Sequence, residues 1–284
     1  MKVGFIGLGQ LGAALAVSIA LKGHNIMAYD INPDRMSLEN LSYFLREEEG
    51  PFGKSTKLSD YVVQSGLTFG SLKSVCDHAD LIFLCINTPH DFLYGGHALI
   101  PDDAPPMDFD YTNLMSAVKN LNEVTTEPKC ISIISTVLPN TIENVIKPIA
   151  SPLLKISYSA QTPAHGTFCP DFYFPEFYMI GCGDPDTDKL LTEFYTAINP
   201  DVPIVKLTIQ EGELLKILYN LFVTTKITFS NLASQMCTNI PNTNVDNITN
   251  ALKLCTKRLI SPSYLSGGMV DSCGCHPRKY CALV

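Results

Sequence analysis

A glycine pattern near the start of the chain has the spacing of a phosphate-binding turn. An apolar segment, 2–6, comes before the pattern, and residues 13–21 after it have helical periodicity. In G-x-G-x-x-G the first glycine permits a tight turn, the second lets the backbone approach a pyrophosphate, and the third allows close helix packing. The first amides of the helix then point at the phosphates. The pattern therefore predicts a dinucleotide-binding turn, made of Gly7, Leu8, Gly9, Gln10, Leu11 and Gly12.

An acidic residue at the end of the next apolar segment predicts which dinucleotide is bound. Residues 26–29 are a short predicted strand, and Asp30 follows them at roughly the 20-residue separation typical of this turn. A carboxylate there accepts hydrogen bonds from a ribose 2′-hydroxyl and repels a 2′-phosphate, which favours NAD over NADP. Arg35 lies nearby and could receive a 2′-phosphate, so it is a further cofactor-binding candidate and keeps NADP open as an alternative.

The elements that must position this turn alternate between strands and helices as far as residue 207. Such alternation predicts an α/β fold, a Rossmann-like doubly wound parallel sheet, whose ligands lie at the carboxyl ends of the strands. Thr88 and Thr136 each come just after a predicted strand and are therefore candidates for the cofactor site. The predicted strands are 79–86, 130–135, 155–159, 178–181 and 204–207, and the predicted helices are 110–121, 140–147 and 185–198.

The composition limits the kinds of partner. The chain has 284 residues, of which 46% are hydrophobic and 17% charged, and these values are those of a globular protein. Its net charge of −8 argues against nucleic-acid binding, and local cations must hold any anionic ligand. No apolar stretch reaches the ~18 residues of a membrane helix. Ten scattered cysteines in a chain of this length indicate reduced thiols and a cytoplasmic location.

A long helix dominates the second part of the chain. Residues 211–237 contain no proline and only one glycine, at Gly212, and predict one uninterrupted helix. Lys216 and Asn220 share a face of it, and Glu213 lies one turn earlier. A further helix is predicted over 245–259. We therefore expect an NAD-binding domain over 1–207 and a mainly α-helical domain with a long central helix over 208–284.

Several segments, taken together and in order, resemble the UDP-glucose/GDP-mannose dehydrogenase family of nucleotide-sugar 6-dehydrogenases. The glycine turn is common to many dehydrogenases, whereas the long helix combined with the cysteine loop is much more specific. The segments that carry the resemblance are the glycine turn, Asn87-Thr88-Pro89, Ser135-Thr136-Val137-Leu138-Pro139-Asn140-Thr141, the helix pattern Glu213-x-x-Lys216-x-x-x-Asn220, and the loop Gly274-Cys275-His276-Pro277-Arg278.

The resemblance implies NAD-dependent oxidation of a sugar C6 alcohol to a carboxylate through a thiohemiacetal and a thioester on Cys275. A catalytic cysteine must be partly deprotonated, and Arg278 lies close in sequence. By the same resemblance Lys216 stabilises oxyanions, Asn220 orients the sugar or a water, and Thr136 lies between the cofactor and a catalytic water. The resemblance also makes the chain a homodimer that binds a nucleotide sugar, with substrate-binding candidates Lys216, Asn220, Arg258, Tyr264 and Gly268.

The sequence departs from the family pattern at three points. Gln161 occupies the slot of a glutamate that handles water, and an amide cannot act as a base. Lys279 stands where an acid usually follows the cysteine loop. The family continues into a second α/β domain, whereas this sequence stops at Val284, so we expect a truncated or divergent protein. From Gln161 we expect impaired thioester hydrolysis, even if hydride transfer survives.

Other readings of the same residues remain open. A β-hydroxyacid dehydrogenase shares the Gly-Leu-Gly opening, a Ser-Thr-Val segment and a Lys-x-x-x-Asn helix, but it needs no cysteine loop. A catalytically impaired protein that binds NAD or a sugar nucleotide is the other alternative. The spacing of the zinc-ligand types near the end of the chain is unusual and predicts no metal site; these residues are Cys273, Cys275, His276 and Cys281. The last four residues, from Cys281, match a prenylation motif only by coincidence, because no polybasic segment precedes them.

Overall fold

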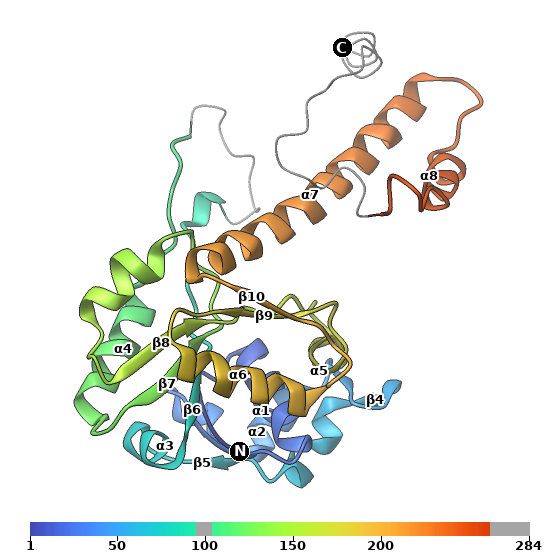
Figure 1. The fold of residues 1–284 in the computed structure, drawn as a ribbon. Helices are drawn as coiled ribbons and strands as arrows, with labels where there is room; N and C mark the ends of the chain where they lie inside the picture. Colours follow the sequence, from blue (N-terminus) through green and yellow to red (C-terminus); the bar gives the residue numbers. More distant parts are fainter. Residues whose placement is uncertain (95–103, 262–284) are drawn as a thin grey trace. The chain divides into compact units, whose positions relative to one another are not determined.

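The computed structural model describes residues 1–94 and 104–261, and its largest element is an eight-stranded sheet (Figure 1). Across the sheet the strands follow in the order β10-β9-β8-β7-β6-β1-β2-β5. The chain order reverses between β1 and β6, as in a doubly wound α/β fold, and the predicted Rossmann-like fold class is confirmed. The strands are β1 Lys2–Ile6, β2 Asn25–Tyr29, β5 Thr68–Phe69, β6 Leu81–Leu84, β7 Lys129–Ile133, β8 Leu154–Tyr158, β9 Tyr178–Gly181 and β10 Ile204–Leu207.

The sheet is not parallel throughout, and here the prediction was wrong. β9 runs antiparallel to β8, with Tyr158 opposite Gly181, and β10 runs parallel to β9. The connection from β8 to β9 runs over residues 159–177 and contains one short helix, α5 (Phe168–Tyr173). Because Tyr158 is the last residue of β8 and Gly181 the last of β9, the two strands approach this pairing from opposite directions.

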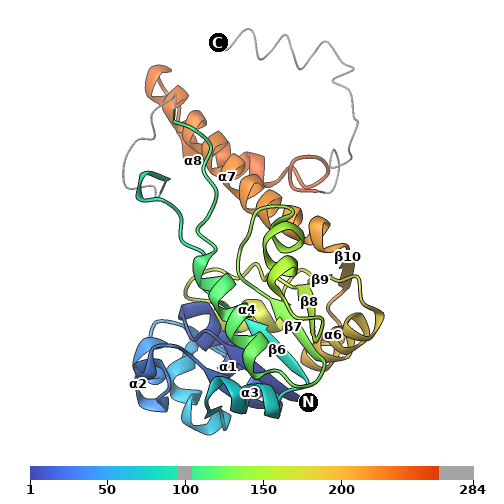
Figure 2. The same cartoon turned by 90° about the vertical axis from the view of Figure 1, so that its left-hand side faces the viewer.

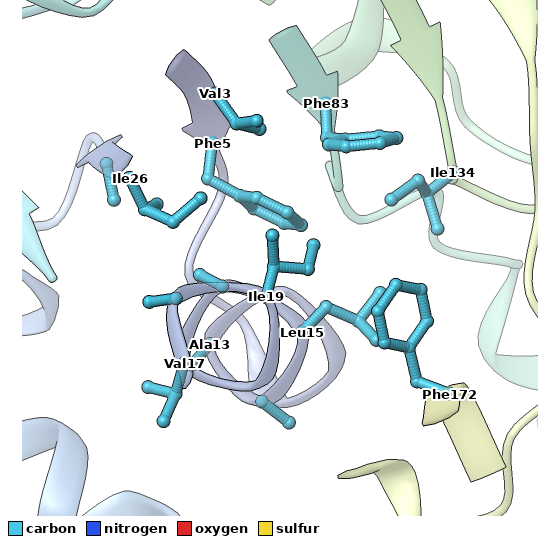
Figure 3. Packing of buried hydrophobic residues seen from close by; sticks show 14 of the residues in the cluster. Val3, Phe5, Ala13, Leu15, Val17, Ile19, Ile26, Phe83, Ile134 and Phe172 are labelled. Carbon is cyan, nitrogen blue, oxygen red and sulfur yellow. The ribbon is translucent and has the colours of Figure 1, made fainter. Parts of the chain in front are cut away.

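Helices cover both faces of the sheet (Figures 1 and 2). On one face α1, α2, α5 and α6 build a core with the strands, and in Figure 3 Ile19 points toward Phe5 while Leu15 points toward Phe172. On the other face α3 and α4 lie side by side, and the first turn of α7 joins their core (Figure 2). The helices are α1 Gln10–Leu21, α2 Leu38–Phe44, α3 Leu72–His78, α4 Thr112–Val124, α6 Pro185–Ile198, α7 Ile209–Asn239 and α8 Val245–Lys253.

Two predicted helices differ from the structure. The predicted helix 140–147 is a π-helical turn, Ile142–Ile146, followed by a 3-10 turn, Lys147–Ile149. Pro148 lacks the N–H that would continue an α-helix. The helix predicted over 245–259 ends earlier, at Lys253, and turns follow it.

Some elements were not predicted at all. β3 (Glu49–Gly50) and β4 (Gly53–Lys57) form a separate antiparallel pair, and β3 and β5 have two residues each. A strand of two residues is too short to show alternation in the sequence. The helix predicted over 185–198 is confirmed as α6, which begins at Pro185 and is capped by the Asp184 side chain through the amide of Thr187.

The chain divides into two compact units, residues 1–219 and residues from 220 onward, and the division falls inside α7. The second unit contains the rest of α7 and α8, whose first turn is capped by the side chain of Asn244. Within the described ranges no helix is both long enough and apolar enough to cross a membrane.

Candidate dinucleotide site and the residues beside it

The carboxyl ends of the central strands lie level with one another. Ile6 of β1 is in register with Tyr29 of β2 and Leu84 of β6, and the register continues through Ile133 of β7 to Tyr158 of β8. The residues that follow these five strands therefore meet at one edge of the sheet. A cavity of about 420 Å³ opens there, at the point where the strand order reverses. Its walls include five residues predicted to bind cofactor: Gly7, Leu8, Gly9, Asp30 and Arg35.

A side chain at each of the three glycines of the turn would have a different consequence. Gly7 has φ +95°, and a Cβ on it would overlap the carbonyl oxygen of Cys85. A Cβ on Gly12 would overlap the carbonyl oxygen of Gly7, so only glycine lets α1 approach the turn this closely. A Cβ on Gly9 would meet nothing within 4 Å. The open space at Gly9 is the room that a bound pyrophosphate needs.

The start of α1 is free to bind an anion. No side chain caps it, and its first turn carries no acidic residue. The other five predicted cofactor residues do not line the cavity: Gln10, Leu11, Gly12, Thr88 and Thr136. The Gln10 amide lies 3.5 Å from Glu48, and Leu11 packs against the core.

Asp30 braces the glycine turn from the end of β2. Its carboxylate accepts hydrogen bonds from the amides of Leu8 at 2.6 Å and Asn32 at 2.8 Å. Each oxygen keeps a lone pair for a ribose hydroxyl. Arg35 lies beside it with its guanidinium 3.7 Å from the centre of the Phe44 ring, so its position in the wall is fixed by stacking.

Sequence reasoning missed one wall of the cavity. Asn113, Ser116 and Asn120 of α4 line it, and Leu72 and Ile86 contribute apolar surface. The three polar residues recur at i, i+3 and i+7, which places them on one helix face. That spacing was visible in the sequence, although an exposed helix face has the same pattern.

Thr88 and Thr136 follow β6 and β7 and hold the two loops together. The Thr88 hydroxyl donates to the carbonyl oxygen of Thr136 at 2.7 Å. One residue earlier, the Ser135 hydroxyl donates to the Ile86 carbonyl at 2.6 Å and accepts from the Ile86 amide at 2.9 Å. The structure therefore brings the two predicted threonines into direct contact, and they fasten neighbouring loops at the edge where the cavity opens.

Lys216 and Gln161 also meet. The Lys216 ammonium donates to the main-chain carbonyl oxygen of Gln161 at 2.6 Å, and burial lowers the pKa of the lysine. The side-chain amide of Gln161, which is buried, donates to the Ser159 carbonyl and to the Tyr195 hydroxyl, both at 3.0 Å. Burial raises the pKa of Tyr195, so this phenol stays protonated. Gln161 is thus a hydrogen-bond donor inside a buried polar chain.

The remaining predicted residues fall in the second unit or outside the described ranges. Asn220 is exposed on α7, one turn after Lys216, and is the first residue of the second unit. Arg258 is exposed in the turns after α8. Tyr264, Gly268, Cys275 and Lys279 lie outside the described residues, as do the other cysteines and the histidine of the tail. Among the described residues no group of three or more potential metal ligands occurs.

An open α/β sheet with a glycine-rich turn, an acid at the end of β2 and a cavity where the strand order reverses defines a dinucleotide-binding domain. Residues 1–199 match the UDP-glucose/GDP-mannose dehydrogenase family, NAD binding domain, and residues 210–284 match the central domain of the same family. The chain belongs to this family. Its cofactor is NAD, and the uncapped start of α1, the space at Gly9 and the Asp30 carboxylate fit that cofactor.

The relatives are considerably longer than this chain. GDP-mannose 6-dehydrogenase of Pseudomonas aeruginosa is 24% identical over an alignment of 248 residues that covers 81% of this chain and 52% of the relative. UDP-glucose 6-dehydrogenase of Rickettsia felis is 23% identical over an alignment that covers 100% of this chain and 60% of the relative. The chain thus spans about half of the length of the GDP-mannose 6-dehydrogenases that it matches.

Solved structures share the fold. The structure of a GDP-mannose dehydrogenase ternary complex from Pseudomonas aeruginosa superposes with a TM-score of 0.83 at 22% identity, and the match covers 100% of this chain and 63% of that one. A UDP-glucose dehydrogenase from Pyrobaculum islandicum gives a TM-score of 0.74 at 22% identity, with 90% and 57% covered. At these identities the likeness bears on the fold alone.

Proposed function

We propose that this chain takes part in the NAD-dependent oxidation of a nucleotide sugar, of the UDP-glucose type, from a C6 alcohol to a carboxylate. Family membership supports the reaction class. The observation that carries the proposal is the position of Lys216. A partly buried ammonium is held on the residue three positions after β8, while the dinucleotide cavity opens at the same edge of the sheet.

The residues divide the work as follows. Oxidation of the alcohol to the acid releases two hydrides in succession, and two molecules of NAD, bound one after the other, would each accept one of them. Lys216 stabilises the oxyanion that develops on the sugar, because a desolvated cation acts strongly on nearby charge. The Cys275 thiolate adds to the aldehyde to form a thiohemiacetal, whose oxidation gives a thioester. Water then cleaves the thioester to the acid and the free thiol. Asn220 orients the sugar or this water.

The direction of the hydrogen bonds at Gln161 supports slow hydrolysis of the thioester. Its amide nitrogen donates to Ser159 and Tyr195, and an amide has no basic lone pair with which to take a proton from water. Hydride transfer does not depend on this side chain in the proposal. The protein therefore releases acid product slowly.

The proposal includes a domain division at 207/208 and a homodimer. In the second unit α7 exposes apolar side chains that are between 43% and 57% accessible. A row of large apolar residues on an exposed helix is typical of an interface, and a second copy of the chain is the proposed partner. An acidic protein needs local cations to hold a diphosphate, and the candidates are Lys216 in the first unit and, separately, Arg258 in the second. The exposed row is Leu221, Phe222, Val223, Ile227, Phe229 and Leu232.

A panel of UDP-, GDP- and ADP-sugars, screened for NADH formation with mass spectrometry of the products, tests the proposal. NADH and an oxidised sugar are expected with at least one member. Replacing Cys275 with Ala should abolish acid formation, whereas a β-hydroxyacid dehydrogenase would be indifferent to it. Two NADH per sugar, with full yield of acid at an ordinary rate, would contradict impaired hydrolysis.

Gln161 favours a second candidate, a protein that binds NAD or a sugar nucleotide without completing turnover. Calorimetry separates the two. Binding of NAD and of a sugar nucleotide, with no NADH from any member of the panel, identifies the binding protein. Light scattering of the purified chain measures the oligomeric state in the same preparation.

A further inference from the structure

Glu213 is a fully buried carboxylate that the proposed chemistry does not use. It lies in the first turns of α7 with 0% of its surface exposed. Its two oxygens accept hydrogen bonds from main-chain amides, Asn140 at 2.6 Å and Ile142 at 2.8 Å. Burying a carboxylate is unfavourable unless its hydrogen bonds are made, so this contact is a specific link between α7 and the loop after β7.

That loop, residues 135–142, carries Thr136 and is fastened at its start by Ser135 and Thr136. In its second half the Tyr111 hydroxyl accepts from the Leu138 amide at 3.1 Å and from the Thr141 hydroxyl at 3.2 Å. The bonds made by Tyr111 tie the loop to the start of α4. Glu213 is the residue that ties it to α7.

The local backbone explains why a carboxylate is needed. Asn140 has φ +70°, in the left-handed region, and Ile142 begins the π-helical turn, so neither amide has a partner within its own segment. Gly212 lets α7 come close, because a Cβ there would lie 3.2 Å from the Tyr158 ring. One carboxylate therefore serves two amides, those of Asn140 and Ile142, on either side of Thr141, whose own amide donates to the Leu138 carbonyl.

The same helix carries Lys216 less than one turn further on. Residues 209–219 belong to the first unit, so the start of α7, the loop and the strand ends form one compact body. A contact that sets the position of α7 against the loop therefore also sets Lys216 against Thr136. Lys216 is in turn hydrogen-bonded to Gln161 after β8, so its side chain is also held by the end of that strand.

We propose that Glu213 is a positioning residue whose carboxylate fixes the loop of Thr136 to α7 and thereby holds Lys216 in its working position. The importance of this position of Lys216 for catalysis rests on the proposed function. The clamp itself is a structural claim and is tested without turnover. Charged and titratable neighbours on the packed elements are Glu143 of the π-helical turn, Lys147 of the 3-10 turn, Tyr158 of β8 and Tyr111 beside α4.

The test variant is Glu213→Gln, with Glu211→Gln as the matched control. Gln keeps the shape but offers one acceptor and presents an N–H group to the second amide. Glu211 lies on the same helix, and its exposed carboxylate accepts only from Thr208 of its own turn. In E213Q, hydrogen exchange of the peptide spanning 138–146 should rise at least tenfold, while E211Q should match the wild type.

A second measurement reports on Lys216 directly. Acetic anhydride labelling of Lys216, followed by mass spectrometry over a range of pH, gives its reactivity and its pKa. In the wild type burial lowers that pKa. In E213Q the helix end loosens, so labelling should become several-fold faster and the pKa should move back toward that of an exposed lysine. Unchanged labelling and unchanged exchange in E213Q would overturn the clamp.

Kinetics then separate positioning from simple stabilisation. With a substrate found in the panel, kcat of E213Q should fall at least tenfold, whereas the Kd of NAD should stay within twofold, because the glycine turn does not touch Glu213. Lost protection with unchanged kcat would overturn the positioning role. If the wild type turns over no sugar, the proposed function fails, and exchange with labelling still decides the clamp. Should E213Q fail to fold, Glu213→Asp, which shortens the reach by one methylene, is measured in the same way.

Discussion

The Lys216 ammonium lies 2.6 Å from the main-chain carbonyl oxygen of Gln161. A neutral carbonyl compensates a buried cation only in part, and burial lowers the pKa of the lysine as a result. The residue that accepts this bond also donates its side-chain amide to Tyr195 of α6. A single position after β8 therefore couples the cation on α7 to the polar interior of the first unit.

Replacing Lys216 with Met should abolish turnover and stabilise the protein at neutral pH. The apolar side chain removes the cost of burying an ammonium, while the lost hydrogen bond costs about 1 kcal/mol. We expect a net gain on the order of 1 kcal/mol in the free energy of unfolding at pH 7. Because the pKa is lowered in the folded state, the wild type gains stability as pH rises toward the ordinary lysine pKa, and the advantage of K216M shrinks.

Urea unfolding at pH 7 and pH 9.5 measures both effects. Lys189→Met is the control, since Lys189 is 77% exposed on α6 and 4.0 Å from Glu193. Its replacement should change the free energy of unfolding by less than about 0.5 kcal/mol at either pH. A loss of stability in K216M at pH 7 would mean that the bond to the Gln161 carbonyl outweighs the cost of burial.

A carboxylate at position 161 should destabilise the fold at neutral pH. The Ser159 hydroxyl donates to the Met179 carbonyl at 2.5 Å and so accepts from the Tyr195 hydroxyl at 2.6 Å, which in turn accepts from Gln161. In Gln161→Glu the ionised carboxylate has no proton to donate to the Tyr195 hydroxyl, and it faces the Ser159 carbonyl oxygen. We expect a loss of about 1–3 kcal/mol at pH 7.

The loss in Q161E should depend on pH with a definite sign. Facing acceptors raises the pKa of the new glutamate in the folded state, so the protonated variant is stable below the ordinary value of about 4.3 and loses that stability as pH rises. Thermal unfolding from pH 4 to pH 8 follows the effect. Gln64→Glu, an exposed position, should show no such trend. Equal stability of Q161E and wild type at pH 8 would show that the hydroxyls of Tyr195 and Ser159 can turn, so that Tyr195 donates to the carboxylate.

The alternation of strands and helices could be predicted because its periodicity is local. The direction of β9 could not, because no local pattern specifies whether the residues between β8 and β9 return the chain to the start of β8. Contacts such as those of Glu213 with Asn140 and Ile142 join residues about 70 positions apart, and no local pattern specifies them. Gln161 was recognised by resemblance, but its role as a donor appears only when Tyr195 is placed beside it.

Two alanine substitutions in the glycine turn should have different consequences. Gly12→Ala places a Cβ on the Gly7 carbonyl, so α1 must move, and we expect a loss of about 3 kcal/mol or more in the free energy of unfolding. Gly9→Ala meets no atom within 4 Å and should leave the free protein nearly as stable as the wild type. It should nevertheless raise the Kd of NAD at least tenfold, because the methyl group occupies the space of the pyrophosphate.

Calorimetry with NAD and thermal unfolding without it separate the two variants. Gly23→Ala is unsuitable as a control because Gly23 has φ +86°. Gly183 lies outside the glycine turn, and a Cβ on it would meet nothing within 4 Å, so Gly183→Ala is the control. That variant should resemble the wild type in both measurements. If Gly9→Ala binds NAD normally, the pyrophosphate does not approach this part of the turn.

The last prediction concerns His24, whose imidazole packs against the Phe194 ring with the centroids 5.2 Å apart. Its Nδ1 is buried and has no hydrogen-bond partner among residues 1–94 and 104–261, and burial lowers the pKa below 6.5. The unfolded chain therefore takes up a proton at a higher pH than the folded protein does. The contribution of His24 to stability is complete above pH 6.5 and is lost as pH falls through the lowered pKa.

His24→Phe keeps the ring contact and removes the titrating group. Relative to the wild type, H24F should gain about 1 kcal/mol in the free energy of unfolding between pH 8 and pH 5, because only the wild type must bury or expel a charge there. His165→Phe, the same change on an exposed ring 5.1 Å from Phe168, is the control and should keep the pH dependence of the wild type. Urea unfolding at the two pH values measures this difference. Parallel curves for H24F and wild type would show that the pKa of His24 is the same in the folded and the unfolded state.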